Sequence, residues 1–370
     1  MIFIIILVLF GRLISESLPD DIFCINCYVL ELLKPYPIIS EALWNKTLIH
    51  SLNKHHSRGT TIVFHVNGEE VKVDYSHFTS THLWDLQRAQ FIEEQVKAIV
   101  ATRYFNRDFK FIYNTHDCPV RGLFNKTINL GPIFGNLRCP SGNNAIIPFP
   151  QWYYKRDGPF SKMRKPQFDK PRIQDIQKRA VFKGFYRESC LEFSTNGPIF
   201  KKNSESYKCG RLKLLTIFRP ELLEVGIFSE HQDEREAIES ITNVEMNPMS
   251  LKEQAGQFKY IVYSEGNCGW ADRLKILLAS PMLILLQETP CHEWYKDFMR
   301  PYVHFVPVKN DWSDLIDKIE WAKENNLKVE VIIRQANILA DWLYNPNIWQ
   351  DYLYELLYEY SQRFLFTEKV

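Results

Sequence analysis

The stretch of sequence that decides the fold extends from Lys259 to Trp312 and reads KYIVYSEGNCGWADRLKILLASPMLILLQETPCHEWYKDFMRPYVHFVPVKNDW. Three apolar runs within it predict strands, at residues 260–263, 282–286 and 303–308. The segment between the first two runs predicts a helix. Strands that alternate with helices indicate an α/β fold with parallel, doubly wound sheets. Ligands of such sheets bind beyond the carboxyl ends of the strands.

The loop after the first of these strands predicts a phosphate site. It carries Gly266, Asn267 and Gly269, and the helix that follows begins near Arg273. The free backbone N–H groups and the dipole of a helix start favour an anion, and Arg273 adds a full positive charge. The G-x-x-G pattern is weak as a motif, so its position after a strand is the stronger argument. The competing interpretation of Arg273 is a solvated helix residue paired with Asp272.

Length and composition indicate a globular chain. At ~150 residues per domain, 370 residues correspond to roughly two domains. Hydrophobic residues make up 45% of the chain, which is too many for a disordered protein. The formal net charge of +1 gives no indication of a nucleic-acid partner, because proteins of that class show a strongly basic face.

The amino terminus has the pattern of a secretory leader. Residues 1–10 are nearly all apolar, and this run is too short to span a bilayer. It resembles the hydrophobic region of a signal peptide that would comprise residues 1–17. The basic region that usually precedes such a run is missing, so a buried terminal strand is the alternative. We expect a protein of the secretory pathway, in the endoplasmic reticulum or Golgi lumen or secreted, without a stable membrane span.

Two sequons and the cysteines support the same compartment. N-glycosylation triplets begin at Asn45 and Asn125, although such triplets often arise by chance. The eight cysteines are an even number, as disulfide pairing requires. For Cys24 and Cys27 we expect a structural disulfide, because no second CxxC or matching histidine pair would complete a zinc site.

We predict five parts of the chain: a signal peptide at 1–17, an N-terminal arm at 18–60, an N-terminal Rossmann-like domain at 61–175, a C-terminal Rossmann-like domain at 176–345 and a C-terminal helix at 346–370. The arm looks irregular or partly helical. In the first domain, Asn67-Gly68 between apolar runs predicts a hairpin. Other predicted elements are a helix at 83–100, a strand at 109–113, an ordered loop region at 131–172, a short helix at 174–180, a strand at 181–184, and helices at 212–218, 313–325, 328–343 and 347–364.

Asp117 is the candidate catalytic residue. It follows the predicted strand at 109–113 and precedes Pro119. Its carboxylate could act as a general base that takes the proton from an acceptor hydroxyl as that oxygen attacks an anomeric carbon. The competing interpretation is an Asx-turn residue beside Pro119. Two domains that face each other across a cleft would bring Asp117 to the loop before Arg273.

Arg187 is a candidate contact for a diphosphate. A guanidinium binds phosphate oxygens bidentately and can stabilise charge on a departing nucleoside diphosphate. Its competing interpretation is a surface arginine paired with Glu188. Lys183 is a weaker candidate for the same anion. No Asp-x-Asp motif is placed to hold a metal on a diphosphate, so we expect a metal-independent transfer with no cofactor, in which a nucleotide sugar is the co-substrate.

Several segments resemble glycosyltransferase family 90, and together they cover about residues 60–364. Residues 300–311, RPYVHFVPVKND, are similar to the family's kPWVHYIPVktD segment and are the most specific match. Residues 182–184 resemble its FRG motif. Residues 259–275 resemble its nucleotide loop, and residues 114–119 resemble its catalytic loop.

The resemblance implies a GT-B architecture, in which two Rossmann-like domains face across a cleft and C-terminal helices follow. It implies an inverting, metal-independent transfer from UDP-glucose or UDP-xylose to a hydroxyl of a protein serine or a glycan. Carried over by position, Asp117 would be the base, and Arg187 and Arg273 would bind the donor.

Partners implied by the resemblance are a UDP-sugar and a folded protein or glycan acceptor. Residues 147–154 fall where the family places acceptor contacts, which predicts acceptor binding by Phe149, Trp152 and Tyr153. Neither a nucleic acid nor a resident metal is implied.

The sequence also departs from the family pattern. Lys183 replaces the arginine of the FRG motif, the next arginine is offset by one residue, and His116 replaces an arginine before Asp117. The nucleotide loop is longer and more acidic, and Glu265 and Asp272 would weaken diphosphate binding unless they point away or bind sugar hydroxyls. A second hypothesis therefore stays open, namely a catalytically degenerate relative that acts as a glycan- or protein-binding module. A nucleotide-dependent oxidoreductase is disfavoured, because no G-x-G-x-x-G follows a strand.

Overall fold

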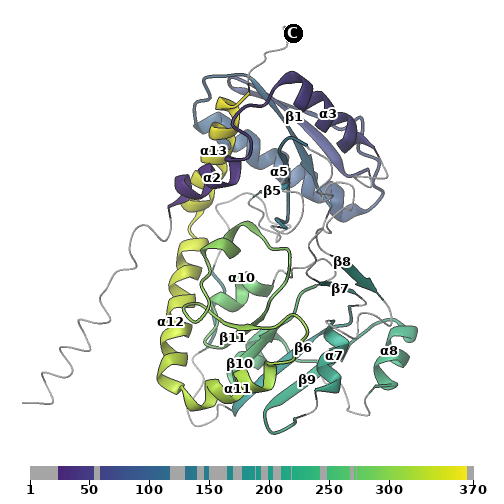
Figure 1. Cartoon of the computed structure of the whole chain (residues 1–370), viewed down its shortest axis with the longest axis vertical. Coiled ribbons are helices and arrows are strands. Elements are labelled where there is room, and N and C mark those ends of the chain that lie inside the picture. Colours follow the sequence, from purple (N-terminus) through teal and green to yellow (C-terminus); the bar gives the residue numbers. More distant parts are fainter. Residues whose placement is uncertain are drawn as a thin grey trace, which may run out of the picture.

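The computed structural model describes residues 24–53, 59–116, 130–139, 146–149, 165–169, 177–187, 189–192, 199–202, 210–217, 219–241, 248–266, 271 and 273–364. The expected signal peptide lies outside this described part. The described residues form two five-stranded sheets, one in each half of the chain, with helices around them (Figure 1).

The N-terminal sheet has the strand order β2-β1-β3-β4-β5. Its strands are β1 (Thr61–Asn67), β2 (Glu70–Asp74), β3 (Phe109–Asn114), β4 (Ile133–Gly135) and β5 (Ile146–Pro148). Strand β1 is antiparallel to β2 and β3, whereas β3, β4 and β5 are parallel. The sheet is therefore mixed. The predicted parallel arrangement is confirmed for β3, β4 and β5, whereas β1 is antiparallel to both of its neighbours.

The predicted hairpin at Asn67-Gly68 is confirmed. Asn67 pairs with Glu70, and Gly68 has a φ of +56°, a conformation that glycine adopts without steric penalty. The predicted helix is also present as α5 (Leu83–Thr102), and it leads into β3.

Two helices precede the sheet and complete its core. They are α2 (Ile25–Leu33) and α3 (Glu41–Leu52), and the hydroxyl of Ser40 caps α3 by accepting from the N–H of Leu43. Val29, Leu33 and Trp44 are buried in the same core as the strands. The segment expected as a partly helical arm therefore contributes to the packing of the N-terminal half.

The C-terminal sheet has the order β12-β11-β10-β6-β9, and all neighbouring strands are parallel. Its strands are β6 (Gln177–Phe185), β9 (Leu223–Phe228), β10 (Phe258–Tyr263), β11 (Leu283–Gln287) and β12 (Val306–Val308). The three apolar runs of the quoted stretch are β10, β11 and β12, which confirms the parallel α/β prediction for this half.

The short helix predicted at 174–180 is wrong, because Gln177 already begins β6. Ala180 pairs with Leu223 of β9 on one side and with Tyr260 of β10 on the other. Pairing with a strand on each side makes this mainly polar segment a strand, although its sequence does not show the alternation of apolar and polar residues that predicts one. Helix α7 (Arg211–Thr216) was predicted. Not predicted were β9, α8 (Gln232–Glu239), α9 (Leu251–Gln257) and the hairpin of β7 (Ser189–Glu192) and β8 (Ile199–Lys202). Strands β4 and β5 also lie in the region predicted as a loop at 131–172, which is wrong for these two segments.

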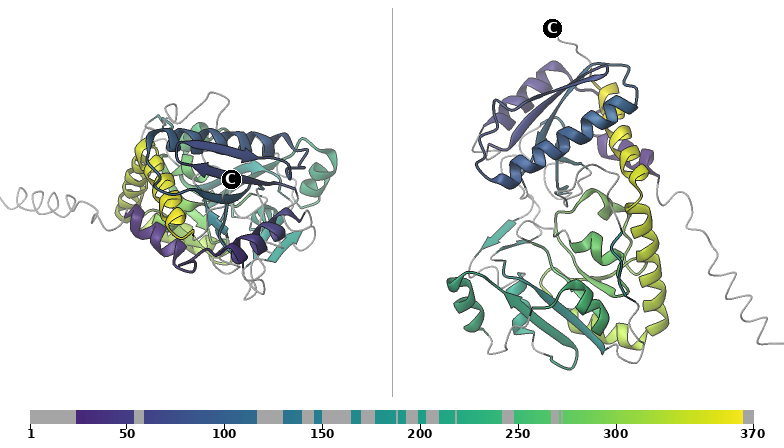
Figure 2. Two further views of the ribbon diagram at one scale, coloured as in Figure 1. Left: turned by 90° about the horizontal axis from the view of Figure 1, so that it is seen from above. Right: turned by 180° about the vertical axis from the view of Figure 1, so that it is seen from behind.

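The C-terminal helices confirm their predictions and connect the two halves. Helices α11 (Leu315–Glu324) and α12 (Asn326–Leu343) lie along the C-terminal sheet, and α13 (Pro346–Gln362) continues beside the N-terminal one (Figures 1 and 2). The hydroxyl of Tyr352 donates to the carbonyl of Pro148 at 2.8 Å, and that of Tyr360 donates to the carbonyl of Lys110 at 2.9 Å. None of the helices in the described residues is long and apolar enough to cross a bilayer.

A second connection between the halves is covalent. Cys139, after β4, forms a disulfide with Cys291, after β11. Next to it, Arg138 lies 2.7 Å from Asp297 in the 3₁₀ turn η5 (Trp294–Phe298), and the hydroxyl of Tyr28 donates to the same carboxylate at 2.7 Å. The expected disulfide between Cys24 and Cys27 is also present.

Candidate functional site

The candidate site lies at the carboxyl edge of the C-terminal sheet, where β6 and β9 end beside the start of α9. A cavity of about 460 Å³ lies between these three elements. Its walls combine apolar side chains with two cations and a carboxylate, and the lining residues include Phe185, Phe228, Met249, Leu251, Lys183, Glu253 and Arg273. An apolar hollow bounded by a positive charge suits a ligand with a flat ring and an anionic group.

Arg273 is the first residue of α10 (Arg273–Leu278) and reaches the end of β6. Its Nη1 donates to the carbonyl of Lys183 at 3.3 Å, and its Cζ lies 5.2 Å from the centre of the Phe182 ring. The absence of a side chain at Gly184 allows this approach, since a Cβ there would lie 2.5 Å from Nη2 of Arg273. The predicted donor contact is therefore on the cavity wall.

A second arginine, Arg211 at the start of α7, was missed by the sequence analysis. It is 4% exposed. Its Nε donates to the carbonyl of Glu265 at 3.0 Å, and its Nη1 donates to the carbonyl of Phe185 at 2.7 Å. Its Cζ lies 5.5 Å from the centre of the Phe182 ring, which Arg273 also contacts. Phe182 thus brings two guanidinium groups to one place.

Arg187, Arg211 and Arg273 interact as a cluster of like charge, which we call the arginine cluster. Burial lowers the pKa of Arg211 well below its usual value, and repulsion by Arg273 and Arg187 lowers it further. Burial also lowers the pKa of Arg273 to about 10, and Arg187 adds to this effect. An anion would relieve the repulsion within this cluster, and phosphate matches the fork geometry of arginine.

Lys183 also lines the cavity, but its ammonium group is already paired with a carboxylate. Its Nζ forms a salt bridge with Glu224 at 2.9 Å, and Arg179 binds the other carboxylate oxygen at 2.9 Å. The side chain crosses Gly226, where a Cβ would lie 2.5 Å from its Cδ. Because Glu224 already neutralises Lys183, the geometry favours Arg273 as the cation that meets a ligand, and donor binding by Lys183 stays a prediction.

The two cations at the start of α10 have separate partners. While Arg273 lines the cavity, Lys275 forms a buried ion pair with Glu293 at 2.6 Å. Ahead of them, the N–H of Ala271 donates to the hydroxyl of Tyr263 at 2.7 Å. These contacts fix α10 against β10 and against the segment after β11.

The predicted glycine loop is described only at its start. Gly266 is buried, while Asn267 and Gly269 lie outside the described residues. Glu265 is 1% exposed, and its N–H donates to Oε1 of Gln287 at 3.2 Å. Arg273 and Arg187 lower the pKa of Arg211, whereas the negative charge of Glu265 raises it.

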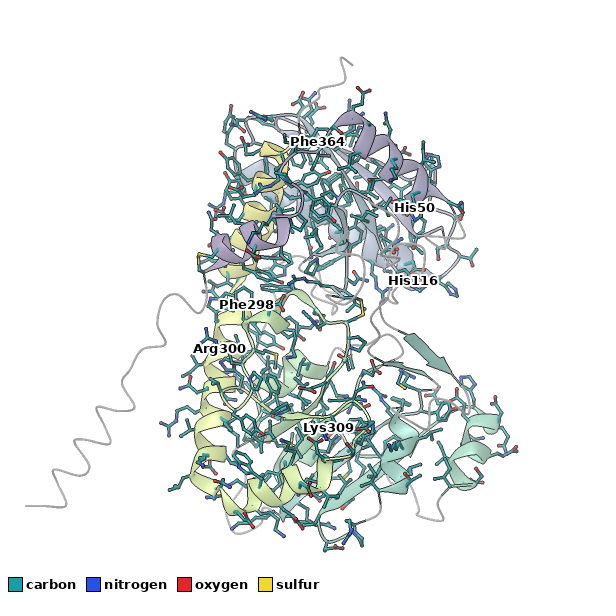
Figure 3. The ribbon with its side chains drawn as sticks, viewed as in Figure 1. His50, His116, Phe298, Arg300, Lys309 and Phe364 are labelled. Carbon is teal, nitrogen blue, oxygen red and sulfur yellow. A yellow bond between two sulfur atoms is a disulfide. The ribbon has the colours of Figure 1, made fainter. Side chains whose placement is uncertain are left out.

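Asp117 lies outside the described residues, but the strand end before it is firmly held. Arg88 of α5 donates to the carbonyl of Thr115 at 2.9 Å. The side-chain amide of Asn136 donates to the carbonyl of Thr115 at 3.3 Å and to that of His116 at 3.2 Å. Figure 3 shows His116 on the side of the N-terminal half that faces the C-terminal sheet. The chain therefore enters the predicted catalytic loop from a fixed point on this side.

Phe149 is not placed to touch an acceptor. It is fully buried, and its ring packs in an aromatic core with those of Phe111, Tyr113 and Phe134. The expected acceptor contact at this position is therefore corrected to a core residue. The other two expected acceptor contacts, Trp152 and Tyr153, lie outside the described residues.

Of the two sequons, Asn125 lies outside the described residues, and Asn45 is exposed on α3. The threonine of that triplet has a structural role, because buried Thr47 accepts from the N–H of Gly131 at 2.7 Å and donates to the carbonyl of Leu43 at 2.7 Å. Modification of Asn45 stays a prediction. Within the described residues, no three histidine, cysteine, aspartate or glutamate side chains are grouped to hold a metal ion, and metal independence also stays a prediction.

A parallel sheet with cationic side chains and an apolar cavity at its carboxyl edge is the arrangement of α/β proteins that bind phosphorylated ligands at strand ends. The family model described as Glycosyl transferase family 90 matches residues 78–370, and the chain belongs to this family. The family resemblance of the sequence is thereby confirmed.

Individual relatives match parts of the chain. Protein O-glucosyltransferase 3 of Homo sapiens is 33% identical over 107 residues, which are 29% of this chain and 21% of that protein. O-glucosyltransferase rumi of Drosophila melanogaster is 24% identical over 226 residues, which are 60% of this chain and 51% of that protein. Uncharacterized protein 035R of Invertebrate iridescent virus 3 is 35% identical over 138 residues, 34% of this chain and 12% of that protein. The chain thus spans about a fifth of the first relative and about half of the second.

Proposed function

We propose that this protein is an inverting glycosyltransferase that moves glucose or xylose from a UDP-sugar to a hydroxyl of a protein or glycan acceptor. The observation that carries the proposal is the arginine cluster beside the apolar cavity, at the strand ends of a parallel sheet. The names of two relatives, which describe O-glucosyltransferases, support a sugar donor and a protein acceptor.

The cavity suggests how a nucleoside diphosphate would bind. The uridine would occupy the apolar part between Phe228, Met249 and Leu251, and the diphosphate would lie toward Arg273, the member of the arginine cluster that lines the cavity. As the bond between the anomeric carbon and the phosphate oxygen breaks, negative charge grows on the leaving UDP. Guanidinium groups fixed beforehand stabilise that charge without reorganisation, which is the contribution that a metal ion makes in other transferases.

Asp117 would supply the base on the acceptor side. Its carboxylate would take the proton of the acceptor hydroxyl while that oxygen attacks the anomeric carbon from the face opposite to UDP. The configuration at that carbon would invert in one displacement. The hydrogen bonds from Arg88 and Asn136 to the end of β3 would limit the positions that this loop can take.

We propose a GT-B arrangement in which the N-terminal half binds the acceptor and the C-terminal half binds the donor. Two sheets joined by α13 and by the disulfide of Cys139 and Cys291 support two domains with a limited range of relative motion. Disulfides persist in oxidising compartments, which supports the secretory pathway as the location.

Calorimetric titration with UDP in the presence of a chelator tests the donor half of the proposal. Binding at micromolar to low millimolar UDP is expected, and no binding at millimolar UDP would leave the enzyme hypothesis without a donor. A subsequent screen of UDP-glucose and UDP-xylose, first for hydrolysis and then for transfer to a folded cysteine-rich protein module, identifies the sugar.

Asp117→Asn tests the base. The variant should keep UDP affinity and lose transfer by at least about a hundredfold, because a general base contributes 10²–10⁴ in rate. A variant that binds UDP and retains wild-type turnover would exclude Asp117 as the base. The alternative of a binding module is favoured if the wild-type chain binds a glycan or protein but neither binds UDP nor turns over a UDP-sugar.

A further inference from the structure

We propose that Tyr263 is a positioning residue for the donor phosphates, because its hydroxyl sets where α10 begins and thereby places Arg273 on the cavity wall. The inference rests on the proposed function, since it assigns Arg273 to the diphosphate. It concerns a residue that neither the sequence patterns nor the family motif singled out.

The geometry centres on a single buried hydroxyl. Tyr263 is the last residue of β10 and is 3% exposed. Its oxygen accepts from the N–H of Ala271 at 2.7 Å and lies 3.4 Å from the carbonyl oxygen of the same residue. That carbonyl accepts from the N–H of Leu274 at 3.1 Å, which is the first turn of α10. The phenol therefore ties the end of the strand to the start of the helix.

This tie acts on Arg273 through the backbone. Arg273 is two residues after Ala271, and its guanidinium is held at the other end by the carbonyl of Lys183 and the ring of Phe182. A helix start that shifts moves the Cα of Arg273 relative to these two partners. Burial, and next the negative charge of Glu293, raise the pKa of Tyr263, so the phenol keeps its proton and can both accept and donate.

A purely structural role would lie in the aromatic ring, which packs in the core, and not in the hydroxyl. Tyr263→Phe separates the two, because it keeps the ring and removes only the oxygen. Tyr260→Phe is the matched control. Tyr260 lies on the same strand, is fully buried on the opposite face, and its hydroxyl has no hydrogen-bond partner within the described residues.

Calorimetry with UDP and with uridine then distinguishes phosphate positioning from general damage. For Tyr263→Phe we expect a Kd for UDP about fivefold above wild type, as the loss of one net hydrogen bond predicts, and an unchanged Kd for uridine. For Tyr260→Phe we expect both constants to be unchanged. A Tyr263→Phe variant that binds UDP as wild type does, or that loses UDP and uridine affinity equally, would overturn the positioning role.

Hydrogen exchange provides a readout that does not depend on a ligand. The backbone amide of Ala271 should exchange faster in Tyr263→Phe than in wild type and at the wild-type rate in Tyr260→Phe, because only the first variant loses its acceptor. Unchanged exchange in Tyr263→Phe would overturn the tie itself. If the wild-type protein binds no UDP, the proposed function is wrong, and the role of Tyr263 in phosphate binding is wrong with it. If the wild-type protein binds UDP and Tyr263→Phe binds it equally well, only the role of Tyr263 is wrong.

Discussion

Gly184→Ala tests the assignment of Arg273 most directly, because it introduces a single methyl group where the guanidinium passes. The new Cβ would lie 2.5 Å from Nη2 and 3.4 Å from Cζ of Arg273, and 3.2 Å from Cζ of Phe182. Optimal separations between such atoms are about 3.5–4.0 Å, so the guanidinium must retreat by about 1 Å. The backbone of Gly184 is not in the left-handed region and accepts alanine without strain.

The expected cost falls on ligand binding and not on folding. Arg273 is a flexible side chain, and its retreat breaks the 3.3 Å hydrogen bond to Lys183, which costs about 1 kcal/mol, and disturbs its contact with the Phe182 ring. A hydrogen bond between charged groups contributes about 1.5–3 kcal/mol, so the loss of one contact to phosphate raises the Kd for UDP by about 10- to 100-fold.

The assay is calorimetry with UDP together with thermal unfolding. Gly256→Ala on α9 is the control, since a Cβ there meets nothing within 4 Å. It should raise stability by about 0.5–1 kcal/mol and leave UDP affinity unchanged. Wild-type affinity of Gly184→Ala for UDP would refute the placement of the diphosphate at Arg273. A loss of several kcal/mol in stability would refute the view that the Arg273 side chain and the Phe182 ring can make room for the methyl group.

Two predictions concern the ion pairs of the scaffold. Burial opposes ionisation of Asp297, but the hydrogen bond and charge of His292, followed by the charge of Arg138, outweigh it and lower the pKa of this carboxyl. Because the pKa of this carboxyl is lower in the folded than in the unfolded protein, its ionised form stabilises the fold. This stabilisation is complete above the unfolded pKa of about 3.9 and is lost as the pH falls through the pKa of the folded protein. Asp297→Asn should therefore lower the Tm at pH 7 and reduce its decline as the pH falls below about 4, and a parallel decline in both proteins would contradict this. Lys275→Met should destabilise the protein by about 3–5 kcal/mol in urea unfolding, because it leaves Glu293 buried without its cation. Adding Glu293→Gln should recover much of that loss, and no recovery would show that the buried charge is not the cause.

The sequence predicted the strands whose own residues show an apolar pattern or a turn motif. The runs at 260–263 and 282–286 are apolar throughout because both faces of a parallel sheet are covered, and their residues in β10 and β11 are buried. Asn67-Gly68 predicted its hairpin for a similarly local reason, since the turn requires a residue with positive φ.

Where the prediction failed, the cause lies far away in the sequence. The first residues of β6 are polar and become a strand because β9 and β10 flank them. Arg211 belongs to the site because its guanidinium bonds to carbonyls 54 residues ahead and 26 residues behind in the chain. Phe149 was assigned to acceptor binding from the family resemblance of residues 147–154, and such a resemblance does not show whether an aromatic ring faces a ligand or packs in a core.

The acidic donor loop was the reason to consider a degenerate relative, and the position of Glu265 weakens that reason. Its charge raises the pKa of Arg211, which means that it stabilises this cation in a buried place. Together with Glu265, the arginine cluster keeps a net positive charge, which the two phosphates of a nucleoside diphosphate can balance. Glu265 therefore reduces the repulsion among the arginines before the donor binds and does not cancel the attraction for it. The choice between an enzyme and a binding module then depends on Asp117, the proposed general base, and less on the loop that we propose binds the donor.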